Sequence, residues 1–244
     1  MASSPPTAPP PQADSPLGDW SAYFAALTRA DQEWAVKYGG KFGIFTGRNS
    51  HFNTIRVAQP IFKHDWQSLS PTEARILLGL IDSDGADYGH LGAMKAAGAA
   101  KNVFLDPTPQ NLKTRSSIQD ALNSVLVVPL SDSLPLMARR AHEIITNRDG
   151  FSVGVATRLL ALARPEVLVS VNNESVKRLA QWSDIPAATI KTSSGYEKFV
   201  RWVMNGKWWK TPAPEEPFER EIWSYRAALL DGLIYEGQHF RDHL

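Results

Sequence analysis

The sequence predicts a mostly α-helical fold, and three observations favour it. First, apolar residues recur at helical spacing in many segments, as Trp20, Phe24 and Leu27 do. Second, helix-start signals precede such segments, and Ser70 with Glu73 three residues later is a capping box. Third, no segment sustains the alternation of apolar and polar residues that marks a half-buried strand. We therefore expect many short helices around a shared core.

The composition narrows the class of protein. The chain has 244 residues, of which 43% are hydrophobic, enough for one sizeable domain or two small ones. It has no cysteine, which excludes disulfides, thiolate nucleophiles and cysteine metal sites. No apolar run approaches the ~20 residues that span a bilayer. We expect a cytoplasmic monomer without a metal or cofactor.

The order of the segments predicts three parts. Residues 1–16 form a Pro/Ser/Ala tail without the basic and apolar regions of a secretory signal, so we expect them to be disordered. Residues 17–130 form an N-terminal helical part, in which 40–63 is expected to be an irregular loop or a short hairpin. Residues 131–244 form a second helical part that shares the same core. Helices are expected at 18–39, 70–84, 87–104, 113–130 (capped near Ser116), 132–147, 174–182, 195–204 and 219–236, and also between the break at Asp149-Gly150 and Pro165, with an extended link at 166–173 and a loop at 205–217.

Positive charge gathers in the middle of the chain. Between residues 136 and 210 there are twelve Lys and Arg residues against six Asp and Glu residues, a net charge of +6 on a chain whose total is +1. From residue 211 onward, seven acidic residues oppose three arginines. A basic stretch on a nearly neutral chain is typical of a surface that binds a polyanion, although a lysine-rich solvated surface gives the same pattern.

Residues 147–165 predict a helical hairpin within this basic stretch. Asp149 and Gly150 break one helix, and the next carries Val155, Leu159 and Leu162 on one face before Pro165 ends it. The backbone N–H groups that begin a helix have no partner within it, so a helix N-terminus with small residues can hold a phosphate oxygen. The candidate DNA-binding residues are Ser152, Val153, Gly154, Val155, Thr157, Arg148, Arg158 and Lys177.

Two motifs around this hairpin resemble a known superfamily. The motif "SVGVAT" followed by a Leu-rich helix, and then "VSVNNESVKRL", is similar to the central segment of the helix-hairpin-helix base-excision DNA glycosylases. Val153 and Gly154 match the end of the hairpin, and Val176, Arg178 and Leu179 match the helix after the catalytic aspartate. The resemblance covers residues 139–182. It implies a glycosylase-like helical bundle and, as partner, double-stranded DNA with a modified base.

The departures from the family pattern limit the chemistry. Ser152 replaces the first hairpin glycine, and Ala156 stands where bifunctional members carry a lysine nucleophile, so a Schiff-base lyase route is not implied. Asn173, or Asn172 if the link is one residue shorter, occupies the position of the catalytic aspartate. Asparagine can orient a water but cannot stabilise a cationic sugar by charge. Candidate carboxylates are Glu174, Asp149 and Asp231, and capping of the next helix is an alternative role for the asparagines.

Aromatic and polar residues elsewhere are candidates for holding an extruded base. Enzymes that act on a base remove it from the stack and hold it against aromatic or apolar faces. The candidates are Trp66, His51, Asn53, Trp208 and Trp209. The alternative is that the tryptophans anchor the core and that the residues near His51 only form a turn.

Two functions remain open on these observations. The first is a monofunctional DNA glycosylase that releases a modified base and leaves an abasic site; by analogy, its substrate includes hypermodified phage DNA and its role is defence. The second is a non-catalytic helix-hairpin-helix module that recognises DNA or a modified base for a partner nuclease. A third reading is an all-α interaction protein in which the hairpin only contributes to packing.

Overall fold

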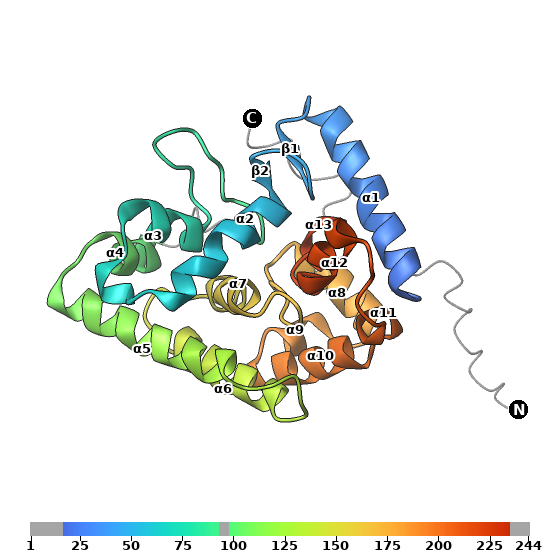
Figure 1. The fold of residues 1–244 in the computed structure, drawn as a ribbon. Helices are drawn as coiled ribbons and strands as arrows, with labels where there is room; N and C mark the ends of the chain where they lie inside the picture. The colour runs from blue at the N-terminus through green and yellow to red at the C-terminus, as the bar shows by residue number, and fades with distance from the viewer. Residues whose placement is uncertain (1–16, 93–97, 235–244) are drawn as a thin grey trace, which may run out of the picture.

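The computed structural model describes residues 17–92 and 98–234 and confirms a mostly α-helical protein (Figure 1). The predicted tail 1–16 lies outside these ranges. Within the described part, the helices are α1 (Trp20–Lys37), α2 (His51–Ala58), η1 (Gln59–Lys63), η2 (Trp66–Ser68), α3 (Pro71–Leu78), α4 (Gly98–Leu105), α5 (Pro109–Leu126), α6 (Leu134–Thr146), α7 (Val153–Ala163), α8 (Ser175–Ser183), α9 (Ala187–Ile190), α10 (Ser193–Asn205), α11 (Lys207–Lys210), α12 (Pro217–Ser224) and α13 (Leu230–Ile234). None of the described helices is long and apolar enough to cross a membrane.

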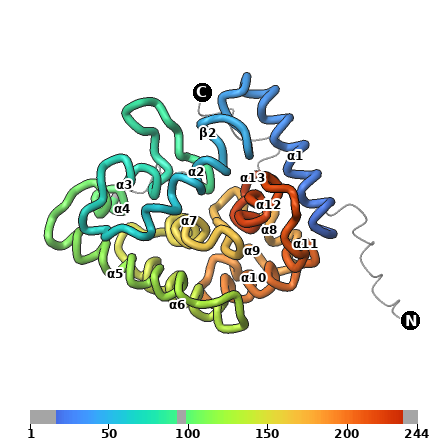
Figure 2. Tube along the Cα trace, viewed as in Figure 1, coloured from blue at the N-terminus to red at the C-terminus, as the bar shows by residue number. Residues whose placement is uncertain are grey.

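Helix α7 lies at the middle of the molecule, with other helices around it (Figures 1 and 2). It contacts α2, α3, α5 and α6. The two ends of the described chain come together, because α1 packs against α11 and α13. One continuous cluster of buried apolar side chains runs from Trp20 to Leu233, so the core is shared by both halves of the chain.

The sequence of α7 accounts for its central place. The predicted apolar face of Val155, Leu159 and Leu162 is buried, and so is every other residue from 155 to 163. Apart from Thr157 and Arg158, these buried residues are apolar, and a helix that is apolar on nearly all sides is covered on all sides. Each fully buried leucine contributes about 1.5–3 kcal/mol relative to an exposed one. This burial fixes the hairpin that α7 shares with α6.

Local signals set several helix ends as predicted, but not all. Ser70 and Glu73 form the predicted capping box of α3. Helix α5, however, begins at Pro109 with Thr108 as its N-cap, rather than near Ser116. Ser116 lies inside the helix, where its hydroxyl donates to the Leu112 carbonyl at 3.2 Å. A serine hydroxyl can donate to a backbone carbonyl in this way inside a helix, so a serine in the sequence does not by itself mark the start of a helix.

Further segments differ from the expectation. The helix expected at 70–84 ends at Leu78, and residues 87–92 of the helix expected at 87–104 are not helical. The region 40–63 contains β1 (Phe42–Gly43) paired in parallel with β2 (Asn49–Ser50), and then α2 and η1 rather than a loop. The expected helix 219–236 is divided into α12 and α13, because the backbone N–H groups of Ala227 and Ala228 donate to the carbonyl of Pro165 instead of continuing the helix. The expected loop 205–217 contains the short helix α11.

Candidate functional site

The turn between α6 and α7 leaves backbone donors at the start of α7. Ser152 caps the helix, with its hydroxyl 3.4 Å from the Val155 nitrogen. The backbone N–H groups of Val153 and Gly154 have no hydrogen-bond acceptor among the residues described. Ser152 is exposed, and Val153 and Gly154 are half-buried. These donors can therefore reach an anion at the surface.

Asn172 lies beside this helix start, at the end of the predicted extended link. Its side-chain oxygen accepts from the backbone N–H groups of Glu174 and Ser175, both at 2.9 Å, so it caps the beginning of α8. A Cβ on Gly154 would lie 3.8 Å from the Asn172 Cβ. Asn173 is instead exposed and accepts from the Lys191 ammonium at 2.8 Å. Of the two asparagines, Asn172 is the one beside the hairpin.

The three candidate carboxylates differ sharply in their surroundings. Asp149 and Glu174 are exposed. Asp231 is fully buried, where its Oδ2 lies 3.3 Å from His51 Nε2 and accepts from the Leu91 backbone N–H at 3.1 Å. The structure thus brings together Asp231 and His51, which lie 180 residues apart in the sequence.

His90 completes a group that we call the histidine cluster: His51, His90 and Asp231. The two imidazole rings have their centres 4.4 Å apart. Trp34 packs edge-on against His51 with ring centres 5.4 Å apart, and Phe42 packs edge-on against His90 at 6.0 Å. Sequence reasoning missed His90, because no local motif marks it and only the tertiary fold places it beside His51.

Burial controls the protonation of His90. Desolvation lowers its pKa well below the usual value, and the charges of His51 and Arg158 lower it further. The backbone of Asn49 opposes this shift, but neither ring nitrogen of His90 makes a hydrogen bond of normal geometry. His90 is therefore a neutral imidazole at neutral pH.

The segment 90–92 joins the histidine cluster to the hairpin side. Leu91 donates its N–H to Asp231, and its carbonyl accepts from the Ser170 hydroxyl at 2.7 Å. Its φ of 66° lies in the left-handed region, which is strained for a leucine. A Cβ on the next residue, Gly92, would lie 3.3 Å from the Asn172 side-chain nitrogen. Asp231 and Asn172 therefore contact neighbouring residues of one short segment.

Arg158 corrects a sequence prediction, because it does not face solvent and cannot bind a DNA phosphate in this structure. Its guanidinium is fully buried and donates to five backbone carbonyls. These belong to Ile76, Leu77, Tyr88, His90 and Gly92. Burial lowers the pKa of Arg158 to about 9, and the nearby Asp231 and Asp87 oppose this shift. Arg158 thus stabilises the backbone of residues 88–92.

The rest of the predicted DNA-binding set is divided by burial. Val155 and Thr157 are buried, and the Thr157 hydroxyl accepts from the Val171 N–H at 2.8 Å, so these two residues position the link rather than contact a ligand. Arg148 and Lys177 are exposed. Arg148 donates to the Ser117 hydroxyl at 2.5 Å.

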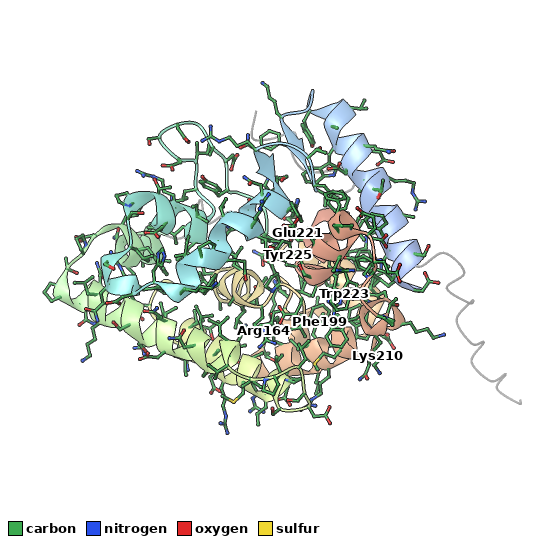
Figure 3. The ribbon with its side chains drawn as sticks, in the orientation of Figure 1. Arg164, Phe199, Lys210, Glu221, Trp223 and Tyr225 are labelled. Atoms are coloured by element: carbon green, nitrogen blue, oxygen red, sulfur yellow. The ribbon has the colours of Figure 1, made fainter. Side chains whose placement is uncertain are left out.

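The basic stretch also contributes less free charge than its composition indicates. Arg164 is buried and paired with Glu166, and it lies toward the middle of the molecule in Figure 3, whereas Lys210 lies at its edge. Arg139 and Arg201 both pair with Glu197.

Of the five candidates for holding a base, only His51 lies in the histidine cluster. Trp66 and Trp208 are buried core residues, and the Trp66 indole donates to the Ile61 carbonyl at 3.2 Å. Trp209 is half-buried and donates to the Glu166 carbonyl at 2.6 Å. Asn53 donates to the Arg48 carbonyl at 2.7 Å, within its own turn. For the tryptophans, the alternative of core packing is the one that the structure favours.

Among residues 17–92 and 98–234, no group of three or more histidine, aspartate or glutamate side chains is placed to hold a metal ion. No protein-family model, no curated protein and no solved structure matches the chain.

Proposed function

We propose that this protein is a monofunctional DNA glycosylase that releases a modified base and leaves an abasic site. The observation that carries the proposal is a convergence on one segment. Asn172, beside the hairpin start, lies close to Gly92, and the buried carboxylate of Asp231 accepts from the backbone N–H of Leu91. Backbone donors can hold a DNA phosphate, a carboxylate can offset the positive charge that builds on the sugar, and an amide can orient a water.

The proposed roles follow from the chemistry of each group. The N–H groups of Val153 and Gly154 hold a backbone phosphate. Cleavage builds positive charge on the sugar, and the carboxylate of Asp231 is the buried group that can stabilise it. The Asn172 side chain orients the sugar or the attacking water. Ala156 is buried and has no amine, so the route has no covalent Schiff-base intermediate.

The test is direct detection of the released base. The full chain is incubated with double-stranded DNAs that carry different base modifications, including hypermodified phage DNA, and free bases are identified by mass spectrometry. We expect base release with an intact strand until alkali or heat is added, and no complex trapped by borohydride. DNA binding that weakens with salt but releases no base from any substrate would instead favour the non-catalytic binding module.

A matched pair of variants tests the carboxylate. Asp231→Asn keeps the shape of the side chain and removes its charge, so we expect an excision rate lower by about 100-fold or more. Asp149→Asn, at an exposed aspartate in the hairpin turn, should retain near-normal excision. Near-normal excision by a folded Asp231→Asn protein would overturn the role assigned to Asp231.

A further inference from the structure

We infer that residues 88–92 form an acid-sensitive latch, which opens when His90 takes up a proton while the helical core stays folded. The inference goes beyond the proposed function and does not depend on base release. In the closed latch, the backbone N–H of Leu91 donates to the buried carboxylate of Asp231, and Gly92 lies beside the Asn172 side chain. Opening of the latch removes both contacts.

Hydrogen bonds from a few side chains hold the latch closed. Arg158 donates to three backbone carbonyls of the segment. The Leu91 N–H donates to Asp231 at 3.1 Å, and the Leu91 carbonyl accepts from the Ser170 hydroxyl at 2.7 Å. Residues 88–92 lie outside the helices and strands, so their attachment depends mainly on these side chains.

Backbone strain at Leu91 favours opening. Its φ of 66° lies in the left-handed region, and the leucine can return to an ordinary conformation only when the latch opens. The release of strain offsets part of the loss of hydrogen bonds. A short segment without regular secondary structure opens at a lower free energy than a packed helix does, so the latch can open on its own.

The charged groups around His90 make the closed latch sensitive to acid. Arg158, from α7, is a buried cation that donates to the His90 carbonyl. His51, from α2, has its ring centre 4.4 Å from that of His90, and its Nε2 lies 3.3 Å from the carboxylate of Asp231, from α13. The other groups packed on His90 are uncharged: the rings of Trp34 and Phe42 and the backbone of Asn49.

The closed latch has no good acceptor for a proton on His90. An imidazolium donates from both ring nitrogens, but neither nitrogen of this buried ring makes a hydrogen bond of normal geometry. The carboxylate of Asp231 already contacts His51, and the half-buried Asp87 acts on Arg158. Burial, together with the charges of His51 and Arg158, therefore lowers the pKa of His90 well below its usual value.

Proton linkage sets the direction and the size of the effect. In the open latch the His90 ring is in water, where its pKa is about 6.5. Below this pH the open form binds a proton that the closed form does not, so closure is fully favoured above pH 6.5 and is progressively lost as the pH falls. Uptake of one proton increases the open population about tenfold per pH unit.

Hydrogen exchange of the full chain at pH 6.5 and pH 5 tests the latch. Exchange rates are corrected for the intrinsic effect of pH and expressed as protection factors. We expect the protection of the Leu91 N–H to fall at least tenfold between the two pH values. At both values it should be at least tenfold lower than that of the Leu159 N–H, inside α7, and dilute urea should leave it unchanged, because a local opening exposes little surface.

Three variants identify the group that takes up the proton. His90→Leu cannot be protonated, so its Leu91 protection should change by less than twofold between pH 6.5 and pH 5. His90→Gln should give the same result, and it serves if the leucine variant does not fold. His142→Gln, at a buried histidine of α6 that contacts Ser193, should keep the pH dependence of the parent.

Two results would overturn the latch. Equal protection of the Leu91 and Leu159 N–H groups would mean that only global unfolding exposes residues 88–92. A pH dependence that is absent from the parent, or that persists in the His90 variants, would mean that His90 is not the group that drives opening. Neither result depends on base release, so the latch and the glycosylase can fail separately.

Discussion

A single buried guanidinium holds separate stretches of backbone together beneath the candidate site. Arg158 donates to the carbonyls of Ile76 and Leu77, in the last turn of α3, where the regular pattern of helical hydrogen bonds ends. Its other bonds reach Tyr88, His90 and Gly92. Each of its five N–H groups therefore has an acceptor, which offsets the cost of burying the charge.

Replacement of Arg158 should be severe for that reason. Arg158→Ala removes the guanidinium donor from five carbonyls, of which that of Ile76 keeps the Gly79 N–H, so we expect the free energy of unfolding to fall by at least about 3 kcal/mol. For a chain of this size, Tm should fall by about 6–12 °C. Arg178→Ala, on the exposed side of α8, should change stability by less than about 0.5 kcal/mol. Urea and thermal unfolding measure the stability of both variants. Similar stabilities of Arg158→Ala and Arg178→Ala would contradict the structural role of Arg158.

His142 should make stability depend on pH. Burial lowers its pKa from 6.5 to about 4, while its Nδ1 lies 2.9 Å from the Ser193 hydroxyl. Between pH 6.5 and 4 the unfolded chain therefore binds a proton that the folded chain does not, so its contribution is full above pH 6.5 and is lost toward pH 4. The loss amounts to about 3 kcal/mol. His90 adds to it in the same direction.

The variant His142→Gln isolates this contribution. The amide cannot be protonated in this range, so the free energy of unfolding should fall less steeply between pH 6.5 and 4 than in the parent. Urea unfolding at a series of pH values measures the slope. An unchanged slope would mean that His142 takes up its proton equally well in the folded and the unfolded chain.

At the scale of the element, the hairpin uses two glycines for different reasons. Gly150 has a φ of +79°, and a Cβ there would lie 2.1 Å from the Ala99 Cβ in α4. Gly154 has an ordinary helical backbone, and the nearest atom to its Cβ would be the Ser152 hydroxyl oxygen, at 3.7 Å. The first glycine is required by the turn, whereas the second leaves space beside the free N–H groups.

Two substitutions separate these roles. Gly150→Ala should lower the free energy of unfolding by at least about 2 kcal/mol, through backbone strain and a steric clash. Gly154→Val should change stability by less than about 1 kcal/mol. It should nevertheless weaken DNA binding by about tenfold for all sequences alike, because it obstructs donors to a phosphate. Filter binding measures the DNA affinity and thermal unfolding measures the stability. Unchanged DNA affinity in Gly154→Val would contradict a phosphate site at the start of α7.

At the scale of the whole molecule, tertiary structure redistributes the charge. The stretch from 136 to 210 has a net charge of +6, but Arg158 and Arg164 are buried, and Arg139 and Arg201 share Glu197. Exposed charge near the hairpin comes from Arg148 in the turn and from residues of α8 such as Lys177. A DNA footprint is therefore expected around the hairpin and α8, rather than over the whole stretch.

Salt dependence distinguishes the two groups of charges. The double variant Arg148→Ala/Lys177→Ala should lower the slope of log affinity against log salt by about 1.8, which corresponds to two lost phosphate contacts. The double variant Arg139→Ala/Arg201→Ala removes the same charge from a site that is already paired, and its slope should stay close to that of the parent. Equal slopes in both double variants would place the DNA away from the hairpin.

The sequence by itself determined the helical class and the helices with strong local signals. Capping and periodicity depend on neighbours a few residues apart, so both ends of α1, the start of α3 and the end of α7 could be predicted. The same holds for Asn172, whose place at the start of a helix is a local property. The end of α3 could not be predicted, because the helix stops at Leu78, before the left-handed Gly79, rather than at 84. Helix α2 was missed because its eight residues follow a glycine-rich turn, and so short an apolar segment does not distinguish a helix from a strand.

The tertiary structure alone decided which residues meet and which are buried. His51, His90 and Asp231 come from α2, a connecting segment and α13, and no pattern of nearby residues indicates their contact. The burial of Arg158 was equally hidden, because an arginine in a basic stretch is ordinarily exposed. Backbone carbonyls from α3 and from residues 88–92 make its burial possible. Helices form from local interactions, whereas the site depends on packing between distant segments.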